Sequence, residues 1–338
     1  MPTRPATATM ARMAEALTVA LRIADEVLFP AAPEVERAGR VPGSHLDLLA
    51  EHGFYGLAAP DSTLDVPDYP AVQRIVETIA GGCLTTTFVW MQHHGAVMAV
   101  AESGNEPLRT RYLAELTAGR IRAGLAAGAA VRPGPPSLRA TPVDGGWLFD
   151  GTAPWVTGWG MVDVLHIAAR TDDDLLVWAL VDAVNSAEVT VVPVEMVAVQ
   201  ASRTVTMEVE SLFVPHERVT STVSRAEHLK GDPESVRFTG SLALGVAGRA
   251  LQLAALGHAE LDAVRDALVG AQPDAVPRAR ANATELALRA AAALVVHNGS
   301  RAVLAHDHGQ RLLREAGFLL VFGSRPGIRS ALLDRFCH

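Results

Sequence analysis

The sequence predicts an α+β protein in which two helical regions flank a β-rich region. Apolar residues recur at helical spacing over residues 10–120, runs rich in Val, Thr, Ile and Trp fill residues 121–220, and long Ala- and Leu-rich runs follow from residue 233. A hydrophobic content of 49% over 338 residues supports a sizeable core. We therefore expect an N-terminal helical domain at 1–120, a middle β-domain at 121–232 and a C-terminal helical bundle at 233–338.

In the N-terminal region, helices are expected wherever apolar residues keep the helical period. Ser44 is expected to cap the second helix, Gly53 to end it, and Pro60 to open a loop that runs to Asp68. The expected helices cover residues 13–27, 45–52, 71–80, 85–101 and 106–117.

The middle region carries strand composition separated by turn signals. Residues 147–149 form a candidate strand, and the pair Asp150-Gly151 is expected to turn the chain into the next one. Further strands are expected at residues 162–169, 175–181, 189–194 and 204–209. Because no helices alternate with these strands, we expect an antiparallel sheet.

The C-terminal region returns to helix. Long helices are expected at residues 235–268, 276–304 and 309–322, with a break at Gln272-Pro273-Asp274. Short connections between long helices predict antiparallel bundle packing.

Charge and cysteine content exclude several classes of protein. The net charge is −8, Lys230 is the only lysine, and no polybasic run exists, so a nucleic-acid partner is not expected. No apolar window has the uninterrupted length of a membrane span, so no membrane association is expected. Cys83 and Cys337 give neither a disulfide framework nor zinc spacing, which favours a cytoplasmic location.

Trp155 and Thr157 are the most informative pair. Two residues apart on a strand, they are expected to project from the same face. A flat aromatic plane beside a hydroxyl suits a flat heterocycle with polar edges, such as a flavin. The alternative from these residues alone is that Trp155 is a core residue and Thr157 an ordinary strand residue.

The order of several motifs resembles the acyl-CoA dehydrogenase family. The strongest is GGWLFDGTAPWVTGWG at Gly145–Gly160, which resembles the family's middle-domain motif. Other segments that match in order are Leu48–Leu57 with Pro60, Gly104–Gly119, Leu212–Pro215 and Leu244–Ala250. The resemblance implies a helical, β and helical domain order, FAD held beside Trp155 and Thr157, and a homodimer or homotetramer built through the C-terminal bundle.

In the family, a carboxylate removes the proton α to a thioester carbonyl, and the β-hydrogen leaves as hydride to the flavin. The resemblance places Phe322 where the usual Glu stands, and phenylalanine cannot take a proton. Some relatives carry the Glu near the start of the first C-terminal helix, where Glu234 lies one residue from the matching position. Glu234 is the candidate base; the alternative is a helix-start carboxylate that favours the dipole.

The remaining site predictions also rest on the resemblance. His94 and Phe322 are expected to line the substrate pocket. Adjacent histidines on a helix point in different directions, so His93 and His94 are not expected to bind a metal. The usual flavin-binding loop is replaced by Gly128–Ser137, of which Ser137 keeps a hydroxyl. An "R..FG" element is missing, so FAD binding is expected to be weak or dependent on a partner.

These observations predict an oxidoreductase that dehydrogenates a specialised acyl thioester, bound to CoA or to a carrier protein, at its α,β bond. Two alternatives stay open. One is a catalytically incomplete subunit that pairs with a complete homologue in a hetero-oligomer. The other is a flavin monooxygenase on the same fold, which needs no carboxylate at position 322.

Overall fold

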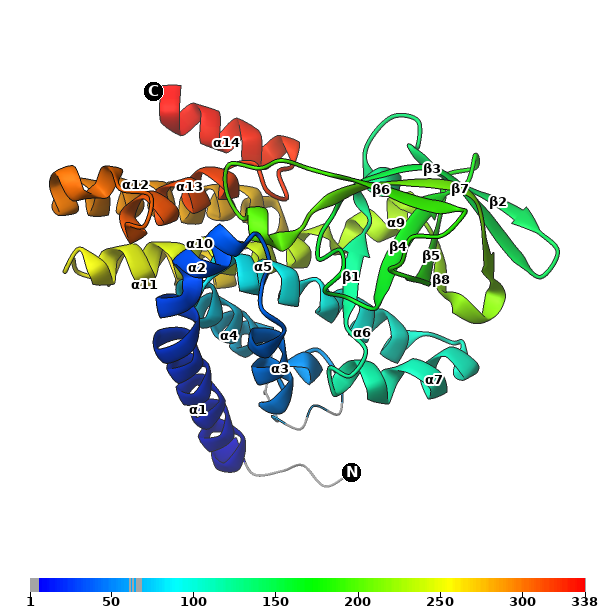
Figure 1. The fold of residues 1–338 in the computed structure, drawn as a ribbon, viewed down its shortest axis with the longest axis horizontal. Coiled ribbons are helices and arrows are strands. Elements are labelled where there is room, and N and C mark those ends of the chain that lie inside the picture. The colour runs from blue at the N-terminus through cyan, green and yellow to red at the C-terminus, as the bar shows by residue number, and fades with distance from the viewer. Residues whose placement is uncertain (1–5, 61, 63, 65–68, 338) are drawn as a thin grey trace.

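A computed structural model describes residues 6–60, 62, 64 and 69–337. Helices gather on one side of the molecule and a twisted sheet lies on the other (Figure 1). The order of elements is helical, then β-rich, then helical, which confirms the predicted α+β class.

The N-terminal helices follow the predicted pattern with two differences. They are α1 (Ala6–Arg22), α2 (Phe29–Ala38), α3 (Gly43–Glu51), α4 (Tyr69–Gly82), α5 (Leu84–Met91), α6 (His93–Glu102) and α7 (Glu106–Thr117). A π-helical segment, η1 (Ile23–Leu28), joins α1 to α2. The single helix expected at 85–101 divides at Gln92, whose side chain donates to the Phe88 carbonyl at 3.2 Å and so occupies a helical acceptor.

Ser44 is not the helix cap. The helix begins at Gly43, and the Pro42 carbonyl accepts from the His45 N–H at 3.1 Å, so Ser44 already lies in the first turn. Gly53 ends this segment as predicted, with a φ of 75° that suits glycine. Most of the loop expected from Pro60 to Asp68 lies outside the described residues.

The sheet has eight strands among the described residues, in the order β6-β7-β3-β2-β4-β5-β8, with β1 paired to β4. The strands are β1 (Ala123–Ala126), β2 (Leu138–Val143), β3 (Gly146–Val156), β4 (Val164–Arg170), β5 (Leu175–Asp182), β6 (Val189–Pro193), β7 (Val205–Pro215) and β8 (Val219–Ser224). Most neighbours are antiparallel, as predicted. The pairs β1–β4 and β2–β4 are parallel, because the β2–β3 hairpin separates these strands along the chain.

The predicted turn at Asp150-Gly151 is wrong. Strand β3 runs through both residues, and the chain reverses at Asp144-Gly145, the same dipeptide, where Gly145 has a φ of 78°. Gly151 marks a shift in register against β7, and a Cβ there would lie 2.1 Å from the Ser137 carbonyl oxygen. The dipeptide Asp150-Gly151 therefore forms a bulge in β3.

The C-terminal helices are α10 (Asp232–Leu253), α11 (Ala259–Gly270), α12 (Val276–Asn298), α13 (His308–Leu319) and α14 (Pro326–Cys337). The helix expected at 235–268 breaks after Leu253, where Ala255 takes a φ of 54°. The break at Gln272-Pro273-Asp274 is confirmed by a short turn at Pro273–Ala275. Helix α14 was not predicted.

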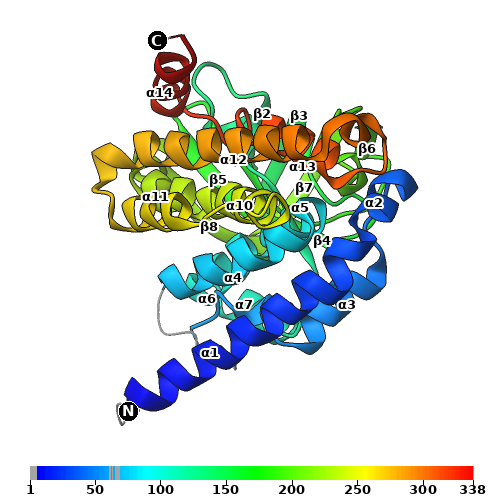
Figure 2. The same cartoon turned by 90° about the vertical axis from the view of Figure 1, so that its left-hand side faces the viewer.

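One hydrophobic core joins the first and last thirds of the chain. Buried residues of α1, α4 and α5 pack against those of α10, α12 and α13, and the end view shows these helices stacked together (Figure 2). Gly245 permits the closest approach, since a Cβ there would lie 2.3 Å from the Glu77 carbonyl oxygen. Buried apolar residues of the strands form a second hydrophobic core.

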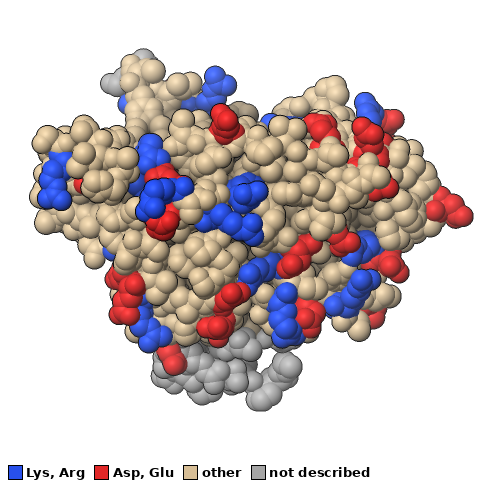
Figure 3. All heavy atoms as spheres, in the orientation of Figure 1, with Lys and Arg blue, Asp and Glu red and all other residues tan. Residues whose placement is uncertain are grey.

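The surface carries mixed charge. On the face in Figure 3, the Lys and Arg atoms of the described residues are interspersed with Asp and Glu atoms and do not gather into a continuous patch. None of the described helices combines the length and apolar character needed to cross a membrane.

Candidate active site

Helix α5 approaches several of the predicted site residues. All eight of its residues, Leu84–Met91, are buried. Phe88 contacts Phe322, and Trp90 contacts His94. Val89, between them, lies beside Gly158, the residue that follows Thr157. The structure thus brings together residues from the sheet and from both helical regions around one buried helix.

Thr157 belongs to a buried chain of hydroxyls. Its Oγ1 lies 3.2 Å from Thr204 Oγ1, which in turn lies 2.9 Å from Ser202 Oγ. The following residue, Gly158, packs on α5: a Cβ there would lie 3.6 Å from Val89 Cγ1. Three hydroxyls share two hydrogen bonds here, so one proton is left to give to another acceptor.

The segment Ser202-Arg203-Thr204 has the composition of a surface turn, but two of its three residues are buried. Ser202 and Thr204 are buried, because η3 (Gln200–Ser202) packs against α5. The spacing of two between Ser202 and Thr204 was the only signal in the sequence.

Trp155 and Thr157 do not share a regular strand face. The register of β3 shifts between Ala153 and Val156, Trp155 takes a φ of 63°, and Thr157 lies beyond the last strand residue. Trp155 is 53% exposed, so it is not the core residue of the alternative interpretation. Ser137 is also exposed, and its carbonyl oxygen accepts from Thr152 N at 2.6 Å.

Phe322 is half-buried in an aromatic group. Its ring stacks on Phe318 at a centroid distance of 5.3 Å and meets Phe88 edge-on at 4.9 Å. The next residue, Gly323, faces Thr239 of α10. Position 322 therefore carries an apolar ring packed between α5 and α13.

His93 and His94 are adjacent but have opposite surroundings. His93 Nε2 lies 3.0 Å from the Leu116 carbonyl oxygen, and its Nδ1 accepts from Ala123 N at 3.0 Å. Neither ring nitrogen of His94 has a partner, although the side chain is 3% exposed. Burial lowers the pKa of each histidine to about 3, so both rings are neutral.

Glu234 lies in the first turn of α10 with its side chain 60% exposed, paired with Arg237. Its carbonyl oxygen accepts from Tyr69 Oη at 3.2 Å. Tyr69 contacts Phe238 at a centroid distance of 5.9 Å, and Phe238 contacts His94 at 6.3 Å. A row of rings thus runs from the main chain of Glu234 to His94. Tyr69, Phe238 and Trp90 carried no motif and were missed.

Helix α12 carries three arginines, the type of side chain that can bind a diphosphate. Arg289 is held by Glu260 and Glu285, and Arg280 is buried with Nε and Nη1 unpaired. Arg278 is exposed. Among the described residues, no group of His, Cys, Asp and Glu has the arrangement of a metal site.

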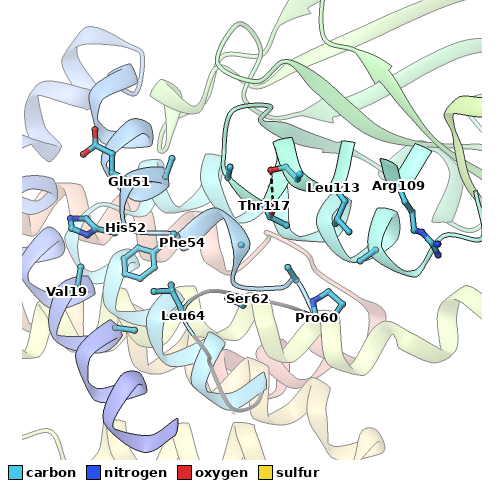
Figure 4. Close-up of a pocket in the computed structure, with 18 of the residues that line it drawn as sticks. Val19, Glu51, His52, Phe54, Pro60, Ser62, Leu64, Arg109, Leu113 and Thr117 are labelled. Atoms are coloured by element: carbon cyan, nitrogen blue, oxygen red, sulfur yellow. Dashed lines mark hydrogen bonds between the residues drawn. The ribbon is translucent and has the colours of Figure 1, made fainter. Parts of the chain in front are cut away.

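A hollow of about 1240 Å³ lies elsewhere, between α1, α3 and α7 (Figure 4). Phe54, Leu113 and Arg109 line it, and none of the predicted site residues does so. Of the predicted site residues, Phe322, His94 and the segment after Thr157 approach α5 instead.

Comparisons with known proteins agree with this architecture. Residues 14–120 match the model of the acyl-CoA dehydrogenase N-terminal domain. The chain is 27% identical over 242 residues to benzylmalonyl-CoA dehydrogenase of Aromatoleum aromaticum, a match that covers 68% of this chain and 63% of the relative. It is 23% identical over 157 residues to the mitochondrial short-chain specific acyl-CoA dehydrogenase of Bos taurus, over 45% of this chain and 38% of the relative.

These matches span less than two thirds of either relative. The fold extends further: butyryl-CoA dehydrogenase from Megasphaera elsdenii superposes with a TM-score of 0.83 over 100% of both chains at 15% identity. The matched N-terminal domain, the relatives and the shared fold together support membership of the acyl-CoA dehydrogenase superfamily.

Proposed function

We propose that this protein is a flavin-dependent oxidoreductase that dehydrogenates a specialised acyl thioester at its α,β bond. The observation that carries the proposal is the buried hydroxyl chain of Ser202, Thr204 and Thr157 beside α5. It offers one unshared proton to a polar ring edge in a water-poor setting, within a fold shared with acyl-CoA dehydrogenases.

The donor set fits the ring end of FAD. Thr157 would give a hydrogen bond to the ring, the exposed indole of Trp155 would cover its plane, and Ser137 would face the cofactor from its loop. When bound, the flavin supplies an acceptor for the hydride that leaves the substrate β-carbon. The diphosphate end has weaker support in this chain, since Arg289 is already paired and Arg280 is buried.

Glu234 is the proposed base. Its carboxylate would take the proton from the carbon α to the thioester carbonyl, and its ion pair with Arg237 holds it at the start of α10. His94 and Phe322 would line the acyl pocket, with Phe322 contributing shape alone. Loss of the usual carboxylate at position 322 favours a specialised acyl group, carried by CoA or by a carrier protein.

A second candidate is favoured by the same replacement. An apolar ring at 322 and the shortage of free cations for a diphosphate suit a partner subunit that pairs with a complete homologue. In either case we expect an oligomer, because large apolar side chains are exposed in the C-terminal helical region: Val296, Val303, Val321, Leu333 and Phe336. Both cysteines are free thiols, which agrees with a cytoplasmic location.

The test is retention of FAD through gel filtration, read from the visible absorbance of the purified chain. We expect weakly bound flavin in the wild type and about tenfold weaker binding in Thr157→Val, because one hydrogen bond to the ring is lost. Thr152→Val is the matched control, since the Thr152 hydroxyl on β3 donates to Glu208 of the neighbouring strand β7. Flavin that is retained only with a co-purified homologue would favour the second candidate, and none in either case would contradict both.

A further inference from the structure

Trp90 and His94 present three buried polar atoms that have no partner. These are Trp90 Nε1 and both ring nitrogens of His94, on side chains that are 1% and 3% exposed. The two rings meet edge to face, with centroids 4.8 Å apart and planes at 88°. Nearly all buried polar groups in folded proteins are hydrogen bonded, so an adjoining set without partners indicates a place where another molecule supplies them.

The neighbouring His93 shows that pairing is available at this depth. Both of its nitrogens are satisfied by main-chain groups of Leu116 and Ala123. Trp90 packs instead against Phe54 at 6.5 Å, and His94 against Phe238 at 6.3 Å, and these rings bring no hydrogen-bonding atom.

The unpaired atoms lie at the inner end of the row of rings that starts at Glu234. Phe238 and Tyr69 are half-buried, whereas His94 is buried, so exposure falls along the row from Tyr69 to His94. An acyl chain whose α-carbon is held near Glu234 would extend along this row toward Trp90. In that arrangement the unpaired atoms of Trp90 and His94 would face the part of the acyl group farthest from the thioester.

The donor set selects the kind of group that fits. The Trp90 N–H only donates, and a neutral imidazole donates from one nitrogen and accepts at the other. Burial keeps His94 neutral by lowering its pKa to about 3. Among the described residues, no arginine or lysine is hydrogen bonded to either ring, so a carboxylate would be buried without a countercharge. A ketone or hydroxyl oxygen satisfies the donors at no such cost.

We propose that Trp90 and His94 form the inner wall of the acyl pocket and bind a keto or hydroxyl oxygen on the substrate's acyl group. The inference rests on the proposed function, because it assumes that an acyl thioester enters this pocket. It adds a substrate class: thioesters whose acyl group carries an uncharged oxygen remote from the carbonyl.

The test compares octanoyl-CoA with its 5-, 6- and 7-oxo derivatives by calorimetry on the full chain with FAD present. We expect at least one oxo derivative to bind about tenfold or more tightly than octanoyl-CoA, because it satisfies groups that are otherwise buried unpaired. In Trp90→Phe and in His94→Phe, the ratio should fall to about twofold or less. Two variants are used so that, if one of them fails to fold, the other still tests the proposal.

Trp178→Phe is the matched control. Trp178 is also buried between histidine rings, His166 at 4.7 Å and His228 at 5.2 Å, but lies in the sheet away from α5. Its variant should keep the oxo preference. Equal binding of oxo and plain thioesters by the wild type, or a preference that survives both variants, would overturn the inference and leave the proposed function intact. Failure of every thioester to bind would overturn both.

Discussion

His93 and His94 are the same residue type, adjacent in sequence and equally buried, yet one is fully hydrogen bonded and the other is not. His93 ties α6 to the end of α7 and to β1 through two main-chain groups. His94 is surrounded by the rings of Trp90 and Phe238. A buried polar group whose hydrogen bonds are all made stabilises the fold. A buried polar group without partners lowers the stability of the fold, and its presence is accounted for if a ligand supplies the missing hydrogen bonds. Three predictions test this difference.

The largest effect is expected at Glu234, which lies at the outer end of the row of rings that begins at His94. Glu234→Gln should slow flavin reduction by an acyl-CoA about 10²- to 10⁴-fold, because the amide cannot take the α-proton. The free energy of unfolding should change by about 0.5 kcal/mol or less, because the Glu234 side chain of the ion pair with Arg237 is exposed to solvent. Stopped-flow absorbance and urea unfolding measure the two quantities. Unchanged reduction would remove Glu234 from the site.

The histidine pair itself predicts opposite effects on stability. His93→Phe should lower the free energy of unfolding by about 2–4 kcal/mol, because two hydrogen bonds are lost and the Leu116 carbonyl and Ala123 N–H stay buried without partners. His94→Phe should cost about 1 kcal/mol or less, or stabilise the protein, because it removes two unpaired nitrogens and keeps the ring contacts. Urea unfolding with an unchanged slope makes the comparison. Equal costs would contradict the distinction.

A third effect concerns pH, where the two histidines should behave alike. Each has a folded-state pKa of about 3, below the unfolded value near 6.5, so the unfolded chain binds more protons between these values. Stability is therefore lost as the pH falls from about 6.5 toward 3, by up to about 1.4 kcal/mol per pH unit for each ring. Either Phe variant should reduce this slope by the same amount. An unchanged slope in His94→Phe would show that His94 is already protonated in the folded protein.

The sequence predicted those features that depend on interactions between residues close together in the chain, such as the ends of helices. Helix α7 has the predicted bounds, because Asn105 caps it and Gly119 takes a φ of 68° after it. The absence of a carboxylate at Phe322 was also visible directly. Which Asp-Gly pair turns the chain could not be read, since Asp144-Gly145 and Asp150-Gly151 differ only in the strand pairing around them.

The site itself depends on contacts between distant segments. Thr204 is buried because α5, more than a hundred residues earlier, covers η3. His93 is paired and His94 is not because the backbones of α7 and β1 pass beside only one of the two rings. The sequence marks both histidines identically, so only the packed structure separates the structural residue from the candidate pocket residue.

The most direct test of the account mixes the flavin-loaded protein with an acyl-CoA thioester in the absence of oxygen and follows the absorbance of oxidised flavin. The proposed dehydrogenation predicts that this absorbance is lost as the substrate is oxidised. Flavin that stays oxidised while calorimetry shows the thioester bound would contradict the proposed activity of this chain.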